Sequence, residues 1–300
     1  MRLPELLTVV GSGQLQLSMP TWWDDLENNE QLQLDSNLGI GIAYASIAVI
    51  ALVQLIRIQV RVPEYGWTTQ KVFHLLNAVV CLLRSGVFFF RPQLECLSPE
   101  ILKLLLLDLP GLLFFTTYTL LVLFWAEIYH QARSMPTGAL RPAFVAFNVL
   151  VYLTQAVLWV LSSRPQLSIE VREAGTLGSD VLLLLVCMAA AISFLLYGGR
   201  LFLMLQRFPI ESRGRRKKLR EVGLVTAICA GSFSIRAMMI AASVFDRSDL
   251  ELDQVGHPLL NILYYSLVEV LPSAAVLFIL RKLPPKRHTQ GYVPIPNGQA

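Results

Sequence analysis

The residues of this chain that could do chemistry are ionisable side chains set deep within long apolar segments. There are two bases and two acids of this kind: Arg84, Asp108, Arg236 and Glu269. A charge near the middle of a bilayer costs about 2.5–3.5 kcal/mol on insertion scales, so such groups pair with one another or serve a ligand. Their similar depth predicts a buried ion-pair network. Two interpretations stay open: a network that fixes helix packing, and a site for a ligand or a proton.

Polar residues in the second apolar segment recur at spacings of three and four, which places them on one face of a helix. This stripe contains Lys71, His74, Asn77, Cys81 and Arg84. A polar face on an otherwise apolar membrane helix turns toward the bundle interior, away from lipid. We therefore assign His74 and Asn77 to the same buried polar network as the four charges.

Catalytic motifs are absent from the sequence. No HExxH, GxSxG, P-loop or dinucleotide-binding fingerprint occurs in it. Of the four histidines only His74 falls inside an apolar segment, whereas a membrane zinc hydrolase needs several ligands at one depth. We expect a protein without enzymatic activity, without a cofactor and without a metal site.

The elements that must position these residues are seven apolar segments. Each reaches or approaches the roughly 20 residues with which a helix crosses a bilayer, and a helix satisfies its own backbone polar groups in hydrocarbon. The expected spans are 37–60, 68–90, 104–129, 143–162, 176–206, 221–245 and 258–280. Only 15% of the 300 residues are charged, against about 25% in soluble domains. The sequence thus predicts an all-α polytopic membrane protein, a seven-transmembrane-helix bundle.

Basic residues give the bundle its expected orientation. Lys and Arg gather in the connections that follow odd-numbered spans and in the C-terminal tail. Because such residues in short loops stay in the cytosol, we expect the N-terminus outside or in a lumen and the C-terminus in the cytosol. The chain then divides into a lumenal N-terminal segment (1–36), the seven-span helical domain (37–282) and a disordered, proline-containing cytosolic tail (283–300).

The expected cytosolic connections supply candidate docking residues. The first group follows the first span, and the second is a basic run before the sixth: Arg57, Arg61, Tyr65 and Trp67, then Arg213, Arg215, Arg216, Lys217 and Lys218. Aromatic and arginine side chains often carry interface energy, and basic clusters attract anionic membrane lipid at about 1 kcal/mol per charge. The alternatives are that the aromatic pair only fixes helix depth and that the basic run only orients the chain.

Three stretches of the chain carry a family resemblance. They read QLIRIQVRVPEYGWTTQKVFHLL at 54–76, LVLFWAEIYHQAR at 121–133 and YYSLVEVLPSAAVLFILRKLPPK at 264–286, and Trp22-Trp23-Asp24 fits as well. These stretches closely resemble the tobamovirus multiplication protein family of plants. The resemblance covers most of the chain from Trp22 to Arg287.

The resemblance implies a function that the residues alone do not indicate. It implies a seven-span protein of the vacuolar membrane (tonoplast), a non-enzymatic anchor and scaffold that supports tobamovirus replication complexes by binding the helicase portion of the viral replication protein. It also implies a small Arf-like GTPase and a tetraspan membrane cofactor as partners, with no direct contact to nucleic acid. A seven-span receptor-like signalling or small-molecule-binding protein stays open as the alternative, because the four buried charges suit it too.

The charge pattern predicts that the two ends of the chain lie on opposite sides of the membrane. With an epitope tag at each end, protease added to sealed cytosol-side-out vesicles should remove the C-terminal tag and spare the N-terminal one. Detergent should make both tags accessible, as a control. Equal protection of the two tags in intact vesicles would contradict the orientation.

Overall fold

A computed structural model describes residues 7–9, 15–17, 29–61, 68–98, 100–207, 213–245 and 258–280. In this part of the chain, seven helices are long and apolar enough to cross a membrane, which confirms the predicted number of spans. They cover Glu30–Arg61, Thr69–Phe89, Ile101–Ala132, Leu140–Ser163, Ile169–Met204, Leu219–Val244 and Pro258–Leu280. The first helix begins earlier than its apolar stretch because the Asn29 side chain accepts a hydrogen bond from the Leu32 amide (3.1 Å) and caps it.

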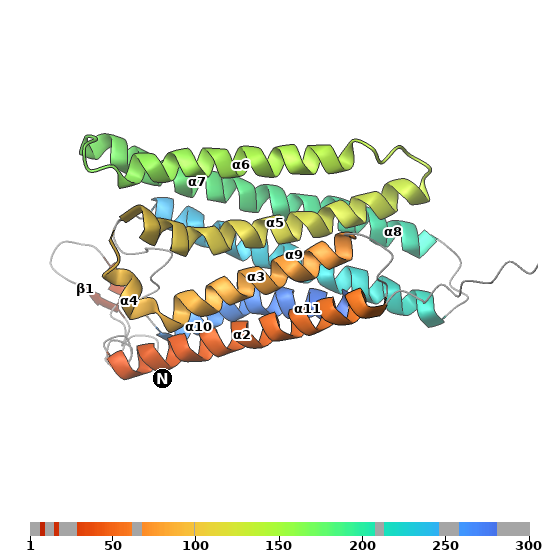
Figure 1. Cartoon of the computed structure of the whole chain (residues 1–300), viewed down its shortest axis with the longest axis horizontal. Coiled ribbons are helices and arrows are strands. Elements are labelled where there is room, and N and C mark those ends of the chain that lie inside the picture. Colours follow the sequence, from red (N-terminus) through yellow and green to blue (C-terminus); the bar gives the residue numbers. More distant parts are fainter. Residues whose placement is uncertain are drawn as a thin grey trace, which may run out of the picture.

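The described elements follow one another as shown in Figure 1. In chain order they are β1 (Leu7–Val9), β2 (Leu15–Leu17), α2 (Glu30–Arg61), α3 (Thr69–Phe89), α4 (Arg91–Glu95), α5 (Glu100–Ala132), α6 (Leu140–Ser163), α7 (Ile169–Ser193), η2 (Phe194–Gly198), α8 (Gly199–Arg207), α9 (Arg213–Phe245), α10 (Pro258–Tyr265), η3 (Ser266–Val270) and α11 (Leu271–Leu280). The elements η2 and η3 are π-helical turns within spans. The antiparallel pair β1–β2 precedes the bundle and has no counterpart in the sequence-based expectation.

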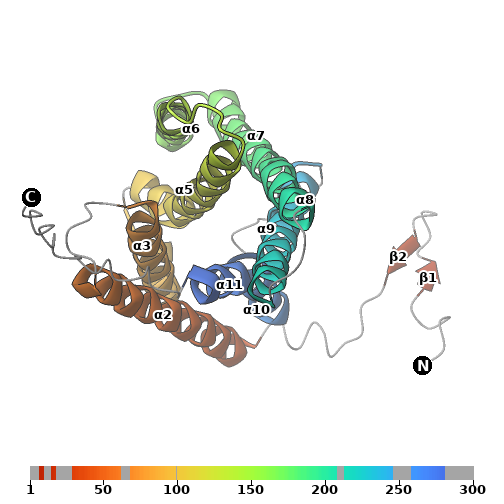
Figure 2. The ribbon, with the colours of Figure 1, turned by 90° about the vertical axis from the view of Figure 1, so that its right-hand side faces the viewer.

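The spans lie side by side and surround a common interior. Figure 2 shows them end-on, from the end at which α2 finishes and α3 begins, which we call the Arg61 end. Going round the bundle, α2 packs on α3, α3 on α5, α5 on α6, α6 on α7, and α7 on α9. The last span closes the bundle, since α10 packs against α2 and α11 against α9, α2 and α3.

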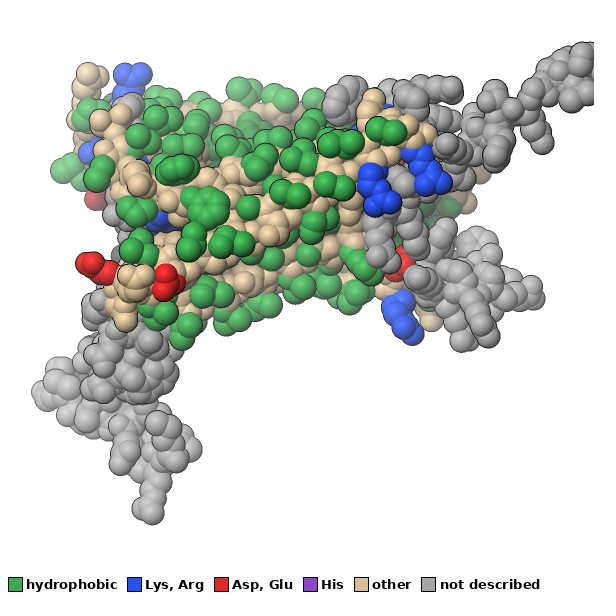
Figure 3. All heavy atoms as spheres, turned by 60° about the horizontal axis from the view of Figure 1, so that its bottom comes forward, with side chains coloured by type: hydrophobic (Ala, Val, Ile, Leu, Met, Phe, Trp, Pro, Cys, Tyr) green, Lys and Arg blue, Asp and Glu red, His purple; other side chains and the backbone are tan. Residues whose placement is uncertain are grey.

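Large apolar side chains cover the outside of the bundle between its two ends. Figure 3 shows this cover on one face, with charged side chains toward the ends. On α6, Leu150 and Leu153 are each 62% exposed. An apolar surface of this extent is rare on soluble proteins and suits contact with lipid tails. The exposed apolar cover and the seven spans together describe a multi-pass membrane protein.

Pro272 shapes the last span, as its lack of a backbone N–H requires. The ring also crowds the carbonyl four residues earlier, so it disfavours a regular α-helix in the turn before it. The chain widens into the π-turn η3 just before this proline. The Ser232 hydroxyl of α9 donates to the Leu267 carbonyl at 3.0 Å and so satisfies an oxygen within the widened turn. The turn carries Glu269 into the bundle interior, where it is 1% exposed.

The second π-turn, η2, sits where α7, α5 and α9 meet. Its Phe194 packs against the rings of Tyr118, Trp125 and Phe233, with centroid distances of 6.3, 5.6 and 5.9 Å. At the end of the turn the backbone of Gly198 approaches α9 closely. A Cβ at this position would collide with Thr226 Oγ1 and lie 2.8 Å from the Trp125 ring, whereas one at Gly199 would meet no atom within 4 Å.

The contrast between these neighbouring glycines yields a matched pair of variants. Gly198→Ala should destabilise the protein by about 1–3 kcal/mol, because Thr226 and the Trp125 ring must both move. Gly199→Ala should instead be neutral or stabilise by up to about 1 kcal/mol, because alanine is the better helix former. The apparent melting temperature of the detergent-solubilised protein measures both. A lower value for Gly199→Ala than for Gly198→Ala would contradict the packing of η2.

A buried arginine–glutamate–arginine cluster as the candidate functional site

The carboxylate of Glu269 holds two arginines in the bundle interior. Arg84 of α3 donates to both of its oxygens, from Nε to Oε2 at 3.0 Å and from Nη2 to Oε1 at 2.9 Å. Arg236 of α9 donates from Nη1 to Oε1 at 2.7 Å. The two-point contact of Arg84 is the geometry that gives arginine–carboxylate pairs their strength and direction. One side chain of the last span thus connects α3 and α9.

Tyr44 adds a third helix to this contact. Its hydroxyl donates to Glu269 Oε2 at 2.5 Å, and its ring stacks on Phe88 of α3 at 5.8 Å. The Tyr265 ring of α10 lies edge-on to Phe88 at 4.8 Å and faces the Arg84 guanidinium at 5.3 Å. The aromatic rings therefore hold Tyr44 and Arg84 in the positions from which they reach the carboxylate.

Gly111 of α5 provides the space that the Arg236 guanidinium occupies and lies beside that of Arg84. A Cβ at this position would lie 2.6 Å from Arg236 Nη2 and 3.8 Å from Arg84 Nη2. Arg84 Nη1 also donates to the Leu107 carbonyl one turn earlier on α5, at 3.5 Å. On the side of α5 the cluster thus contacts the helix backbone rather than a side chain.

Asp108, the second acid of the predicted network, lies beside the cluster. It is half-buried on α5, and its Oδ2 accepts a hydrogen bond from Trp159 Nε1 of α6 at 2.6 Å. Asp108 directly follows Leu107, whose carbonyl receives Arg84. The structure therefore joins Arg84, Arg236 and Glu269 through one carboxylate and ties Asp108 to the neighbouring helix.

His74 and Asn77 lie on α3, between the cluster and the Arg61 end. They are 0% and 1% exposed. The Cys81 thiol donates to Asn77 Oδ1 at 3.5 Å, and the predicted stripe from His74 to Arg84 is buried along one side of α3. Within the described residues, neither nitrogen of His74 nor the amide nitrogen of Asn77 has a hydrogen-bond partner.

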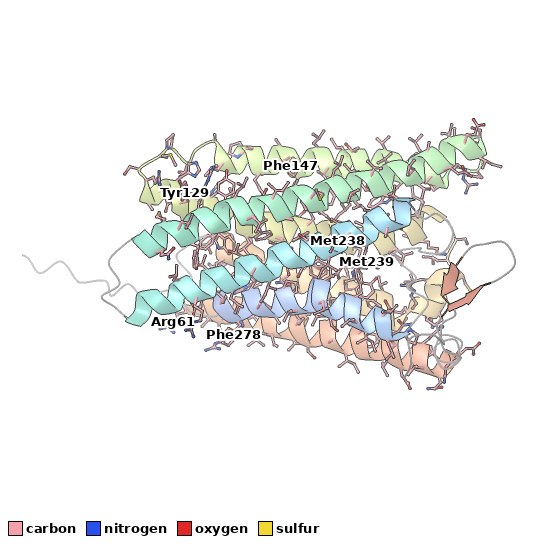
Figure 4. All side chains as sticks on the ribbon, turned by 180° about the vertical axis from the view of Figure 1, so that it is seen from behind. Arg61, Tyr129, Phe147, Met238, Met239 and Phe278 are labelled. Carbon is pink, nitrogen blue, oxygen red and sulfur yellow. The ribbon has the colours of Figure 1, made fainter. Side chains whose placement is uncertain are left out.

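The candidate docking residues are described only in part. Arg57 and Arg61 are exposed near the end of α2, and Figure 4 places Arg61 at the same end of the bundle as Tyr129 of α5. Tyr65 and Trp67 lie outside the described residues. The basic run forms the first turns of α9, where the backbone is described and the side chains are not: Arg213, Arg215, Arg216, Lys217 and Lys218.

Sequence reasoning missed one residue of the cluster, Tyr44, and one ion pair outside it, Glu127 with Arg141. Tyr44 is surrounded by apolar residues in the sequence of α2. Its role becomes apparent only in the three-dimensional structure, where Glu269 of the last span lies opposite. Glu127 of α5 binds Arg141 Nε of α6 at 2.7 Å near the Arg61 end. That pair could have been anticipated, because a short turn joins the two helices and brings their ends together.

The geometry limits what the cluster can do chemically. Both carboxylate oxygens of Glu269 already accept bonds from protein donors, and arginine does not release its proton in proteins. The adjoining cavity, lined by Gly111, Ser232 and Arg236, has a volume of about 20 Å³, which admits one water. No metal-ligand group of three His, Cys, Asp or Glu side chains occurs in the described residues. The arrangement favours helix positioning over ligand binding at Glu269.

Removal of the carboxylate should therefore weaken the fold strongly. We expect Glu269→Leu to destabilise by about 3–5 kcal/mol, because two buried guanidinium groups lose their counter-charge. A variant that makes the whole cluster apolar should recover much of the lost stability. It combines four changes: Tyr44→Phe, Arg84→Met, Arg236→Met and Glu269→Leu. The apparent melting temperature in detergent checks both.

A control is available at a second acid–base pair, Glu127 of α5 with Arg141 of α6. Glu127→Gln breaks a pair whose arginine side chain is 71% exposed, so the loss should stay below about 1 kcal/mol. If Glu269→Leu melts like Glu127→Gln, the cluster does not hold the helices together.

Comparison with known proteins places this chain in a family. The family model described as the THH1/TOM1/TOM3 domain matches residues 18–296. Tobamovirus multiplication protein 1 of Arabidopsis thaliana is 56% identical over 95% of this chain and 96% of the relative. Tobamovirus multiplication protein 1 of Nicotiana tabacum is 53% identical over 95% of this chain and 98% of the relative. Tobamovirus multiplication protein 3 of Nicotiana tabacum is 53% identical over 92% of this chain and 92% of the relative. No solved structure matches the chain. The resemblance noted in the sequence is confirmed: this chain belongs to the THH1/TOM1/TOM3 family, together with the tobamovirus multiplication proteins.

Proposed function

We propose that this protein is a host factor for tobamovirus multiplication that anchors viral replication complexes on a host membrane. The observation that carries the proposal is the 52–56% identity, over at least 90% of the chain, to relatives named for tobamovirus multiplication. The seven apolar helices supply the membrane anchor itself. The vacuolar membrane is the proposed location.

The proposed contact is with the helicase portion of the viral replication protein, at the Arg61 end of the bundle. A viral protein made in the cytosol can touch only the cytosolic side, and the positive-inside rule assigns that side to the Arg61 end. Arg57 and Arg61 are exposed there, and the basic run begins α9 at the same end. Exposed arginines attract an acidic partner over about 8–10 Å at physiological salt.

The same surface is available to host partners. We propose that a small Arf-like GTPase and a tetraspan membrane cofactor join the complex, the GTPase at the Arg61 end and the tetraspan protein along the exposed apolar faces of the spans. Anionic lipid head groups are a further partner for the basic run. No direct contact with nucleic acid and no catalytic step belong to this proposal.

A receptor-like or small-molecule-binding role is the second candidate function. The observation that favours it is the buried polar stripe of α3, in which His74 and Asn77 carry nitrogen atoms that have no hydrogen-bond partner among the described residues. A receptor would depend on interior residues for its response, whereas an anchor depends on its surface. Variants of the two regions therefore distinguish the two functions.

Capture of the viral replication protein from plant membranes tests the anchoring proposal. Charge reversal at Arg57 and Arg61, and separately at the basic run of α9, should each reduce the captured amount several-fold without changing membrane insertion, because the long-range attraction is lost. A third variant, Tyr65→Ala with Trp67→Ala, tests the aromatic contact. Viral RNA accumulation in plants that carry only the variant should fall in parallel.

Arg164→Glu serves as the control, because Arg164 is an exposed arginine at the opposite end of the bundle. This variant should capture the replication protein like the wild type. The docking assignment is wrong if all variants insert normally and capture equally. The anchoring function itself is wrong if the wild-type protein neither captures the replication protein nor supports viral RNA accumulation.

A further inference from the structure

A cleft of about 220 Å³ lies where α3 begins and α11 ends. Residues of α3, α5 and α11 line it: Thr69, Gln70, Phe73, Leu120, Leu121, Phe124, Ile279 and Leu280. Thr69 and Gln70 are the first two residues of α3, and Leu280 is the last of α11. The cleft therefore belongs to the Arg61 end of the bundle, which Figure 2 shows end-on.

The burial of its walls indicates the direction in which the cleft opens. Its floor is closed, since Phe73, Leu120 and Leu121 are only 2%, 6% and 3% exposed. The residues at the helix ends, Thr69 and Leu280 among them, are half-buried. Around the cleft, α2 packs on α3, α3 on α5, α5 on α8, α8 on α9, α9 on α11, and α11 on α2. This ring of helices encloses the cleft on its sides, so its mouth lies at the Arg61 end.

The cleft offers an apolar surface of limited size. Six of the eight lining residues are phenylalanine, leucine or isoleucine. An apolar cavity of about 150 Å³ accepts a benzene-sized molecule, whereas drug-sized ligands occupy pockets of about 300 Å³ or more. The cleft therefore has room for one large apolar side chain, such as that of phenylalanine, and is too small for a drug-sized molecule.

Arginines of α2 lie beside the mouth of the cleft. The contact of Ser85 Oγ with the Gly41 carbonyl (3.0 Å) sets the register of the antiparallel helices α2 and α3. Equal numbers of residues counted from this contact toward the Arg61 end bring Arg57 level with Thr69 and place Arg61 one turn further out. Both arginines are exposed. The α2 side of the mouth is therefore positively charged.

The α5 side of the mouth is positively charged as well. Helix α5 continues beyond the cleft to the exposed Arg133, whose guanidinium lies 5.2 Å from the centroid of the Tyr129 ring. Figure 4 shows Tyr129 at the same end as Arg61. Glu127 does not offset these charges, because its carboxylate binds Arg141 Nε at 2.7 Å.

An apolar pocket with charged residues around it has the anatomy of a protein interface. In such interfaces one buried side chain fills the centre, and a polar rim surrounds it. A positively charged rim favours a partner whose residues beside that side chain are acidic. Gln70 Nε2 donates to the Leu280 carbonyl at 2.8 Å, so the Gln70 carbonyl oxygen and the Thr69 hydroxyl remain to meet the backbone of a bound peptide.

We propose that the cleft receives one phenylalanine-sized apolar side chain from an acidic segment of the partner that docks at the Arg61 end. The proposal rests on the anchoring function, because it names the contact that holds a cytosolic partner in place. The arginines attract the segment over a distance. The buried side chain then slows its dissociation, the step in which most differences in affinity arise.

Competing peptides test the chemistry of the cleft on the purified full-length protein, held in phosphatidylcholine nanodiscs without net charge. The reporter is a peptide of two glutamates, glycine, 4-fluorophenylalanine, glycine and two glutamates, observed by ¹⁹F NMR. Its unlabelled form with phenylalanine should displace it at a concentration at least about tenfold lower than the form with alanine, because alanine leaves most of the apolar surface uncovered. A form with lysines in place of the glutamates should compete several-fold less well than the phenylalanine form.

The peptide comparison is decisive without any variant of the protein. The proposal is overturned if the reporter does not bind, if the phenylalanine and alanine forms compete equally, or if the lysine form competes as well as the glutamate form. Removal of residues 288–300 should leave reporter binding unchanged. If the reporter binds only after this removal, the chain's own C-terminal residues fill the cleft and a partner is not its occupant.

Filled-cleft variants locate the binding. Leu121→Trp and Ile279→Trp fill the cleft from two different walls, and each should weaken reporter binding at least about tenfold. Leu150→Trp and Ile262→Trp make the same changes at side chains that are 62% and 39% exposed on the outside of the bundle, and both should bind the reporter as the wild type does. Undiminished binding to a folded filled-cleft variant places the site elsewhere and overturns the proposal.

Capture of the viral replication protein separates this proposal from the anchoring function. Ile279→Trp should lower capture several-fold at low and high salt alike, whereas charge reversal at Arg57 and Arg61 should act mainly at low salt, where charges are least screened. If the wild type and the folded Ile279→Trp protein capture equally, only the role of the cleft is wrong. If the wild type captures none, the anchoring function is wrong and the role of the cleft falls with it.

Discussion

A carboxylate in a hydrocarbon environment must meet its counter-charge inside the protein, and Glu269 satisfies this constraint with two arginines at once. Arg84, Arg236 and Tyr44 come from three different helices, and all three donate to the same two oxygens. Apolar packing alone would allow these helices to slide or rotate, because lipid tails are as apolar as the side chains that face them. The directional bonds fix depth and rotation together, and the rest of the bundle is arranged around them.

Local features of the backbone support this arrangement. The widened turn that carries Glu269 comes directly before Pro272, and Ser232 donates to one carbonyl of that turn. Gly111 leaves the space for the Arg236 guanidinium on the opposite side. The sequence alone does not indicate that any of these three residues contributes to the cluster. Together they show that the cluster depends on backbone shape as much as on charge.

Much of the fold was predictable because the membrane simplifies it. Hydrocarbon admits little besides helices of about 20 residues, so apolar length alone locates the seven spans, and the spacing of His74, Asn77 and Arg84 gives the buried side of α3. The partners of these residues were not predictable to the same extent. Tyr44 and Glu269 are 225 residues apart, and no periodicity within one helix reports which residue of another helix lies opposite.

The position of Glu269 in the last span has a consequence for the order in which the protein is made. Arg84 precedes its counter-charge by 185 residues and Arg236 precedes it by 33. At about 5–20 residues per second of synthesis, Arg84 enters the membrane roughly 10–40 seconds before any Glu269 exists. For most of that interval the growing chain holds Arg84 in the membrane without its anion, Arg236 joins it for the last 33 residues, and the chain cannot adopt its final packing. Completion of the seventh span thus works as a checkpoint: a nascent chain that stops short of it keeps exposed charge within the bilayer, a state that membrane quality control can recognise.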